Sequence, residues 1–333
     1  MPPSVDVLCM GNAIVDIIAS VEEDFLVRQA VAKGAMILID EPRAEALYAA
    51  MGTTTVISGG SAANTAVGVA GLGVAAGYVG KVRADDVGGF FTQNLRGTGV
   101  SFETAPAHDG PATARSYILV TPDGQRTMNT YLGACQNLTA ADIDEGSVRA
   151  AGLIYLEGYL WDPPAAKEAF TRAAGIAHSA GNRVALTLSD SFCVDRYGAE
   201  FLDLIRSRTV DIVFSNESEL HALYQTADFA TALEAFRAEG MLGAVTRGAA
   251  GCVVVQGGET VAVDAAPIER LVDSTGAGDL FAAGFLAGLA RRSDLRTCAG
   301  LGALAAAEVI QHVGARPVAD LKALARNAGL MPA

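Results

Sequence analysis

From about residue 150 onward, short apolar runs alternate with helical patterns, and this alternation constrains the fold more than any other feature of the sequence. The apolar runs cover 153–156, 184–188, 212–214, 244–245 and 252–255, and the helical patterns cover 165–179, 199–207, 217–224 and 230–239. Uninterrupted apolar runs are typical of strands buried on both faces, and helices between them form βαβ units. The pattern predicts an α/β fold with a mostly parallel central sheet.

Both ends of the chain extend this pattern. Residues 5–10 form an apolar run that predicts a first strand, and a shorter run lies at 56–57. The last third of the chain ends in helical patterns at 277–290, 295–311 and 318–327. A chain of 333 residues is long enough to bury one large core and to carry a smaller appendage.

Two regions break the alternation. The runs 116–120 and 127–131 flank Pro122-Asp123-Gly124, a turn sequence that predicts a β-hairpin. Residues 16–56 place Glu/Asp-rich turns between short apolar pieces such as 36–39. We interpret both regions as strands of a small lid, inserted from about 17–56 and 115–135 into a single domain that covers residues 1–333.

Charge and composition narrow the class of partner. A formal net charge of −13 argues against a nucleic acid, because phosphate neutralisation requires clustered Lys and Arg. The first residues lack the pattern of a signal peptide, and the Ala/Leu-rich stretch 297–310 is too short to span a membrane. Five scattered cysteines without CxxC spacing are typical of reduced thiols. We therefore expect a cytoplasmic protein with a small-molecule ligand.

The segment 273–279, Asp-Ser-Thr-Gly-Ala-Gly-Asp, is the most specific candidate for chemistry. Gly276, Ala277 and Gly278 lie at the start of a predicted helix, where unpaired backbone N–H groups can bind an anion that small residues allow to approach. Asp279 could then accept a proton from an attacking hydroxyl. The alternative is an ordinary Gly-rich turn in which Asp279 favours the helix dipole. No GxxxxGK[ST] sequence occurs, so the chain has no P-loop.

A second Gly-rich cluster lies at 58–64. Gly59 and Gly60 permit close approach of a ligand, and Asn64 could bond a hydroxyl; the alternative is a helix start with Ser61 as N-cap. Asn12 and Asp16 follow the first predicted strand, where an aspartate can bind a polyol or cap a turn.

Two more motifs follow predicted strands. Asn216 and Glu219 have the spacing of a capping box, but Glu219 could also lie near hydrated Mg²⁺ at a phosphate. Thr246-Arg247-Gly248 ends another strand, at the edge of a parallel sheet where ligands bind.

Taken in order, these motifs resemble the PfkB, or ribokinase-like, family of carbohydrate and nucleoside kinases over nearly the whole chain. The N-terminal signature is matched by residues 59–66, the NxxE motif by 216–219, and the C-terminal signature by 273–279 followed by Leu-Phe-Ala-Ala-Gly-Phe. The resemblance implies a three-layer α/β/α sandwich with a β-sheet lid. It also implies ATP and Mg²⁺ as cofactors.

The same resemblance implies roles for individual residues. Asp279 would be the base, and the backbone N–H groups of Gly276, Ala277 and Gly278 would form the anion hole. The acceptor's hydroxyls would be held by Asn12, Asp16, Gly59, Gly60, Ser61 and Asn64. ATP and Mg²⁺ would be bordered by Asn216, Glu219, Thr246, Arg247 and Gly248. Asp273, with backbone carbonyls near Gly314, matches the place where relatives bind a monovalent cation such as K⁺.

Within the family the chain is similar to the adenosine-kinase-like branch, because 42 residues separate Asp16 from Gly59. Arg126 in the second hairpin would meet the γ-phosphate, or it is a solvated hairpin arginine. Tyr159 and Trp161 would stack on a purine, or they pack the domain edge.

The resemblance implies transfer of a phosphoryl group from MgATP to the 5′-hydroxyl of adenosine, a reaction of purine salvage. The alternatives are a ribose or fructose kinase and a catalytically silent nucleoside-binding protein. Two chains could pair through the lid.

Overall fold

The computed structural model describes residues 5–332 and contains a nine-stranded sheet with the order β14-β13-β12-β11-β10-β9-β1-β5-β6. The strands are β1 (Val7–Met10), β5 (Ala76–Val79), β6 (Ser101–Phe102), β9 (Leu153–Glu157), β10 (Arg183–Thr187), β11 (Ile212–Asn216), β12 (Leu242–Thr246), β13 (Cys252–Gln256) and β14 (Glu259–Val263). All pairs from β6 to β12 are parallel, and β13 and β14 add an antiparallel edge. The predicted α/β fold with a mostly parallel sheet is confirmed.

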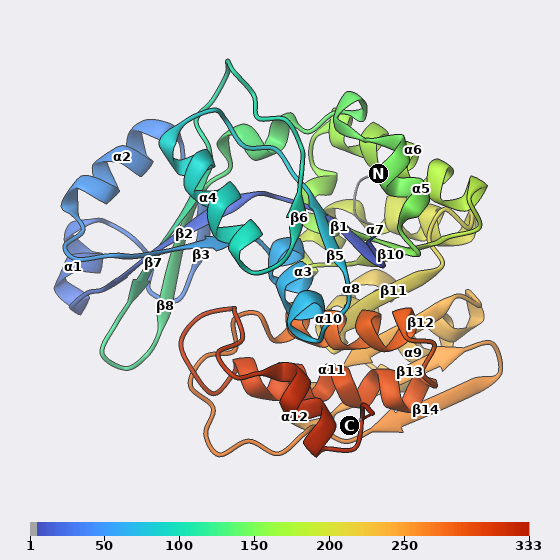
Figure 1. Cartoon of the computed structure of the whole chain (residues 1–333). Helices are drawn as coiled ribbons and strands as arrows, with labels where there is room; N and C mark the ends of the chain where they lie inside the picture. Colours follow the sequence, from blue (N-terminus) through green and yellow to red (C-terminus); the bar gives the residue numbers. More distant parts are fainter. Residues whose placement is uncertain (1–4, 333) are drawn as a thin grey trace.

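Helices cover both faces of this sheet (Figure 1). On β1, Val7 and Cys9 join a hydrophobic cluster with one helical layer, whereas Leu8 and Met10 join a second cluster with the other layer. The first layer contains α3 (Ser61–Gly71), α10 (Ala277–Ala290), α11 (Leu295–Val309) and α12 (Leu321–Asn327). The second contains α5 (Glu145–Ala150), α6 (Pro164–Ser179), α7 (Ser191–Arg206), α8 (Glu217–Tyr224) and α9 (Phe229–Ala238). The strands therefore separate two cores, as alternation of side chains requires.

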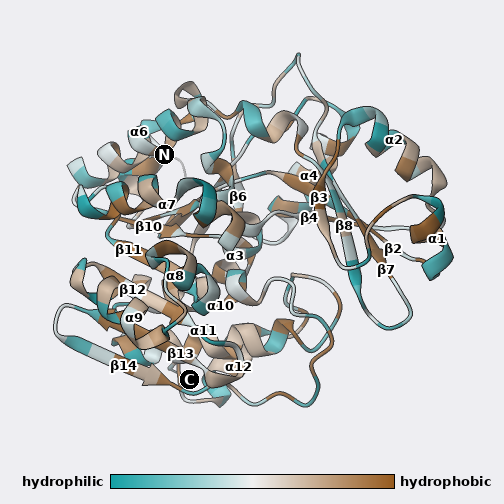
Figure 2. Cartoon of the chain, turned by 180° about the vertical axis from the view of Figure 1, so that it is seen from behind, coloured by the Kyte–Doolittle hydropathy of each residue, from teal (hydrophilic) through white to brown (hydrophobic). Residues whose placement is uncertain are grey.

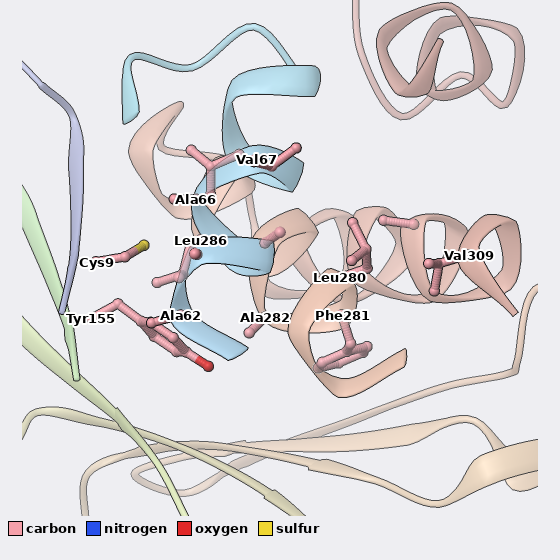
Figure 3. Packing of buried hydrophobic residues seen from close by; sticks show 14 of the residues in the cluster. Cys9, Ala62, Ala66, Val67, Tyr155, Leu280, Phe281, Ala282, Leu286 and Val309 are labelled. Atoms are coloured by element: carbon pink, nitrogen blue, oxygen red, sulfur yellow. The ribbon is translucent and has the colours of Figure 1, made fainter. Parts of the chain in front are cut away.

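Small residues bring α3 and α10 into close contact (Figure 3). A Cβ atom added at Gly68 would lie 2.6 Å from Cβ of Ala283, and one at Gly284 would lie 2.3 Å from the carbonyl oxygen of Leu301 on α11. No larger side chain fits at either position without moving a helix. This packing holds the N-terminal ends of α3 and α10 side by side.

The second sheet has the order β3-β8-β7-β2-β4 and forms the lid (Figure 1). Its strands are β2 (Ile14–Ser20), β3 (Met36–Leu38), β4 (Thr55–Gly59), β7 (Ala114–Val120) and β8 (Arg126–Tyr131). The antiparallel pairing of β7 with β8 confirms the predicted hairpin. Hydrophobic colour follows strands such as β10 and β11, while much of α6 and α7 is hydrophilic (Figure 2).

Several elements differ from the sequence-based expectations. Region 16–56, expected to contain only strands, also contains helices α1 (Glu23–Arg28) and α2 (Glu41–Ala50). The run 56–57 belongs to β4 of the lid, and α7 begins at Ser191 instead of residue 199. Strands β5 and β6 and helix α4 (Asp86–Gly97) were not predicted.

Two further observations bear on the expectations from composition. Within residues 5–332, no helix has the length and apolar character that a membrane crossing requires. All five cysteines are buried and unpaired, in agreement with reduced thiols.

Candidate active site

A cavity of about 720 Å³ lies where the carboxyl ends of the parallel strands meet the lid. This is the edge at which open α/β sheets bind ligands. Many residues that the sequence pointed to line this one cavity although they come from distant parts of the chain. They are Asn12, Asp16, Gly60, Ser61, Asn64, Asn216, Glu219, Thr246, Gly276, Ala277, Gly278 and Asp279.

Asp279 lies in the first turn of α10 and is held by two side chains of α3. The hydroxyl of Ser61 donates to Oδ1 at 2.6 Å, and the amide of Asn64 donates from Nδ2 to Oδ2 at 2.9 Å. Burial raises the pKa of Asp279, while these two hydrogen bonds and the charge of Arg316 act in the opposite direction. The carboxylate is therefore fixed in position, and burial strengthens its binding of a proton.

The start of α10 is shaped to receive an anion. Gly276 is the N-cap with φ of +80°, and a Cβ atom there would lie 2.8 Å from Cα of Ala315. A Cβ atom at Gly278 would meet no atom within 4 Å, so the backbone is open on that side. Helix α10 continues for 14 residues, so its dipole and the N–H groups of its first turn favour a negative charge at this end.

On the lid side, two glycines allow the backbone to lie against Asn12 and Asp16. A Cβ atom at Gly59 would lie 2.2 Å from the Asp16 carboxylate, and one at Gly60, which has φ of +91°, would lie 2.2 Å from the Asn12 carbonyl. Burial raises the pKa of Asp16 to about 7, although Arg316 and Arg126 oppose the shift. Gly60 is the N-cap of α3, so the alternative role of Ser61 as N-cap is not observed.

Glu157, at the end of β9, is a buried cavity residue that the sequence analysis missed. Its carboxylate accepts hydrogen bonds from N of Ala62 at 2.8 Å and from Nδ2 of Asn12 at 3.0 Å. A Cβ atom at Gly11 would collide with it, at 2.1 Å from Oε2. Burial raises the pKa of Glu157 to about 7. An acidic residue directly after the apolar run 153–156 was the available signal.

Arg126 connects the lid to the anion-binding loop. Nη1 lies 3.0 Å from Oδ2 of Asp273 and donates to Oγ1 of Thr275 at 2.9 Å. Nη2 is buried and has no hydrogen-bond partner. Nη2 is therefore a buried donor whose hydrogen bonding is incomplete in this arrangement.

The carboxylate of Asp273 already receives several donors. Besides Arg126, N of Gly314 donates to Oδ2 at 2.9 Å and N of Thr275 donates to Oδ1 at 3.0 Å. The guanidinium of Arg126 already neutralises the Asp273 carboxylate. A second cation such as K⁺ therefore does not fit at this carboxylate unless Arg126 moves away.

Asn216 and Glu219 form the capping box that their spacing predicted. Oε2 of Glu219 accepts from N of Asn216 at 3.0 Å, and N of Glu219 donates to Oδ1 of Asn216 at 2.9 Å. Burial raises the pKa of Glu219 to about 7. Within residues 5–332, no group of three or more His, Cys, Asp or Glu residues could hold a metal ion. Because Mg²⁺ usually keeps several waters, the single carboxylate of Glu219 would hold such an ion through its water shell.

Five of the expected site residues do not line the cavity: Gly59, Arg126, Arg247, Gly248 and Asp273. Arg247 stacks on Phe229 with its guanidinium carbon 3.9 Å from the ring centroid, and it pairs with Glu217. Tyr159 lines the cavity, whereas the ring of Trp161 packs near Phe170 and Phe201 at the domain edge.

The cavity also has walls that the sequence analysis did not identify. One side carries Met36, Leu38 and Met128 of the lid, and the other carries Phe192 and Arg196 of α7. Phe192 is 74% exposed, which is unusual for a large aromatic side chain. Asp190, the N-cap directly before α7, was a sequence signal for the start of the helix that carries Phe192 and Arg196.

Comparisons with known proteins identify one family, and the names of the relatives refer to two classes of acceptor, nucleosides and sugars. The model of the "pfkB family carbohydrate kinase" matches residues 6–321. A solved adenosine kinase from Sinorhizobium meliloti is 53% identical with a TM-score of 0.91, and a probable sugar kinase from Rhizobium etli CFN 42 is 52% identical with a TM-score of 0.93. Both alignments cover 98% of this chain and 99% of the other.

A curated relative is named for a third acceptor, a sugar phosphate. An ATP-dependent ribose-1-phosphate kinase from Halopiger xanaduensis is 34% identical over 237 residues, which are 69% of this chain and 72% of that protein. The names of these relatives divide between nucleoside and sugar acceptors.

Proposed function

Since the chain belongs to the pfkB family of carbohydrate kinases, we propose that it transfers the γ-phosphoryl group of MgATP to the 5′-hydroxyl of adenosine or a related nucleoside. Membership of this family makes it a phosphotransferase with an alcohol acceptor. The nucleoside is the part of the proposal that depends on the cavity of this chain.

The apolar part of the cavity wall is our reason for proposing a nucleoside as the acceptor. Met36, Leu38 and Met128 line it from the lid, and the exposed ring of Phe192 lines it from α7. A nucleobase has flat apolar faces that favour contact with such side chains, whereas a free sugar offers hydroxyls on every side. The hydroxyl-binding candidates Asn12 and Asp16 line the same cavity and suit a ribose.

The proposed reaction uses the fixed geometry at the start of α10. The 5′-oxygen attacks the γ-phosphorus and its proton passes to the carboxylate of Asp279, while the bond to the β-phosphate oxygen breaks and ADP leaves. Negative charge on the transferred group is stabilised by N–H groups of Gly276, Ala277 and Gly278. The unpaired Nη2 of Arg126 supports a contact with the same phosphoryl group.

Cofactor binding follows from the same arrangement. We assign Thr246 and Gly248 to the border of ATP, and Asn216 with Glu219 to the water shell of Mg²⁺. Mg²⁺ supplies charge neutralisation at the phosphates when it is bound. Closure of the lid over the acceptor would exclude water, which otherwise competes as a phosphoryl acceptor. K⁺ at Asp273 remains a prediction and requires Arg126 to be displaced.

A panel of acceptors tests the proposal. Adenosine, other nucleosides, ribose, fructose and ribose 1-phosphate are each supplied with MgATP, and ADP formation is measured. We expect adenosine to give the highest kcat/KM. Preference for any sugar over every nucleoside rejects the nucleoside assignment, and binding of adenosine without ADP formation rejects the kinase reaction.

One observation favours a second candidate, a sugar phosphate. Arg196 lines the cavity beside Phe192 and pairs only loosely with Asp162, at 3.5 Å. Its guanidinium could bind a phosphate on the acceptor. R196M separates the two candidates, because it should abolish use of ribose 1-phosphate but change the KM for adenosine by only about threefold.

The exposed strand β3 at the edge of the lid supports pairing of two chains there. Light scattering of the purified protein tests this expectation, and a monomer mass at all concentrations contradicts it.

A further inference from the structure

Arg316 joins three elements of the site although no sequence motif singled it out. It follows Ala315, which packs against Gly276 at the start of α10. Nε of Arg316 donates to Oδ1 of Asn64 at 2.8 Å. Nη2 donates to the carbonyl oxygen of Ser58 at 2.6 Å and to its hydroxyl at 3.1 Å. One guanidinium therefore ties the end of β4 to the first turn of α3.

These contacts determine which way the Asn64 amide faces. A guanidinium can only donate hydrogen bonds, so the group of Asn64 that faces Arg316 must be the carbonyl oxygen. The amide NH₂ then points to Asp279, where Nδ2 donates to Oδ2 at 2.9 Å. If the amide turned over, its oxygen would face the carboxylate and the hydrogen bond to the base would be lost.

The charge of Arg316 acts on the same carboxylate. The ionisable groups that influence Asp279 or are influenced by it are Asp16 on β2, Tyr155 and Glu157 on β9, Tyr159 after β9, and Arg316. Asp279 and two of these groups, Asp16 and Glu157, are carboxyl groups, and Arg316 is the cation among them. Burial lowers the pKa of Arg316 to about 10, so it keeps its charge at neutral pH.

We propose that Arg316 is a positioning residue for the phosphoryl transfer: it orients the Asn64 amide toward Asp279, and its positive charge favours the carboxylate form of Asp279. The inference rests on the proposed role of Asp279 as base. Arg316 itself does not line the cavity, so it acts through Asn64 and through its electric field.

The experiment measures the titration of Asp279 directly. The ¹³C resonance of its carboxyl group is assigned by its loss in D279N and is followed against pH in the wild type, R316M and R316K. In R316M the titration should move to higher pH, and kcat at pH 7 should fall about 10- to 100-fold, because a buried hydrogen bond to a charged group and a compensating charge are lost. R316K keeps the charge, so its titration should stay near that of the wild type.

R291M is the matched control. Arg291 is also partly buried and donates from Nη2 to the carbonyl oxygen of Leu72, at the opposite end of α3. The substitution removes an arginine that holds the same helix, so it should lower stability without moving the Asp279 titration or the acid limb of the kcat profile. An R316M titration that coincides with that of the wild type overturns the proposal.

The outcome stays decisive if R316M does not fold. R316K alone should then keep the titration and reduce kcat by roughly fivefold, because one ammonium group cannot hold Asn64 and Ser58 in the same geometry. Wild-type kcat in R316K overturns the positioning role. The titration needs no substrate, so a wild-type protein that phosphorylates no acceptor rejects the proposed function and leaves this test intact.

Discussion

The two walls of the cavity are built in opposite ways. On the main-sheet side, every residue of β1 is buried, and α3 packs closely on α10 at Gly68. On the lid side, all three residues of β3 are exposed, including Met36 at 49% and Leu38 at 53%. Close packing therefore fixes the groups proposed to react, while the outer part of the proposed acceptor would meet a sheet edge whose side chains are about half exposed.

The difference predicts that changes at the main-sheet wall affect turnover and changes at the lid affect selection. D279N should reduce kcat by about 1,000-fold, because the proposed base is removed while the fold is kept. ADP formation measures turnover, and calorimetry should show that nucleoside binding is largely retained. D294N is the control: Asp294 caps α11 through N of Thr297, far from the chemistry, so it should cost stability alone. Turnover of D279N within a few-fold of the wild type contradicts the role.

Glu157 tests the electrostatic cost of the main-sheet wall. Its pKa is raised from 4.5 to about 7, so the folded protein binds a proton more tightly than the unfolded chain does. The stabilisation from that proton is complete below pH 4.5 and is lost as pH rises toward 7. The difference in unfolding free energy between E157Q and the wild type should therefore move in favour of E157Q by roughly 3 kcal/mol over this interval.

Denaturant unfolding at several pH values measures this change. E145Q serves as the control, because Glu145 forms an exposed pair with Arg149 and should give no comparable trend. A pH-independent difference for E157Q would show that the buried carboxyl titrates normally.

Arg126 is the point at which the lid reaches the main-sheet wall. R126M should lower kcat by about 100-fold, because the contact with Asp273 and Thr275 and the donor offered to the phosphoryl group are lost together. R115M is the control on the neighbouring strand, where the guanidinium of Arg115 lies over the ring of Tyr131. An equal loss of kcat in R126M and R115M would indicate general damage to the lid.

The lid edge gives the smallest and most selective effect. L38S should raise the KM for adenosine about tenfold and leave kcat nearly unchanged, because an apolar contact of a nucleobase is lost. I37S is the matched control, since Ile37 lies on the same strand but does not line the cavity. If the KM for adenosine rises equally in L38S and I37S, the lid edge does not recognise the base.

The regular part of the fold could be predicted from the sequence because its signals are local. The alternation of buried runs and helical patterns predicted βαβ units and a mostly parallel sheet, and strands β9 to β12 do pair in parallel. The spacing of Asn216 and Glu219 predicted the capping box. Helix α2 was missed although Asp40 caps it and Pro42 lies in its first turn, because it stands among short apolar pieces that read as strands. Strand β6 has only two residues, too few for any periodicity.

The candidate site was predictable only where a motif carried it. Gly276, Gly278 and Asp279 were predicted because they stand together in one motif at the start of a helix, and all three line the cavity. Glu157 and Arg316 were missed because their roles depend on contacts with residues more than 90 positions away, such as Ala62 and Asn64. No spacing rule reports a partner that the chain brings near only after folding.

The sequence by itself determined the family, the layered α/β architecture and the motif that we propose to bind the phosphoryl group, since each depends on neighbouring residues. Tertiary structure decided how that segment is held: the orientation of the Asn64 amide, the buried charges around Asp279, and the placement of Arg126 on Asp273. It also decided which apolar side chains of the lid face the cavity. Hydrogen-bond direction and burial are properties of packed neighbours, so only the folded chain defines them.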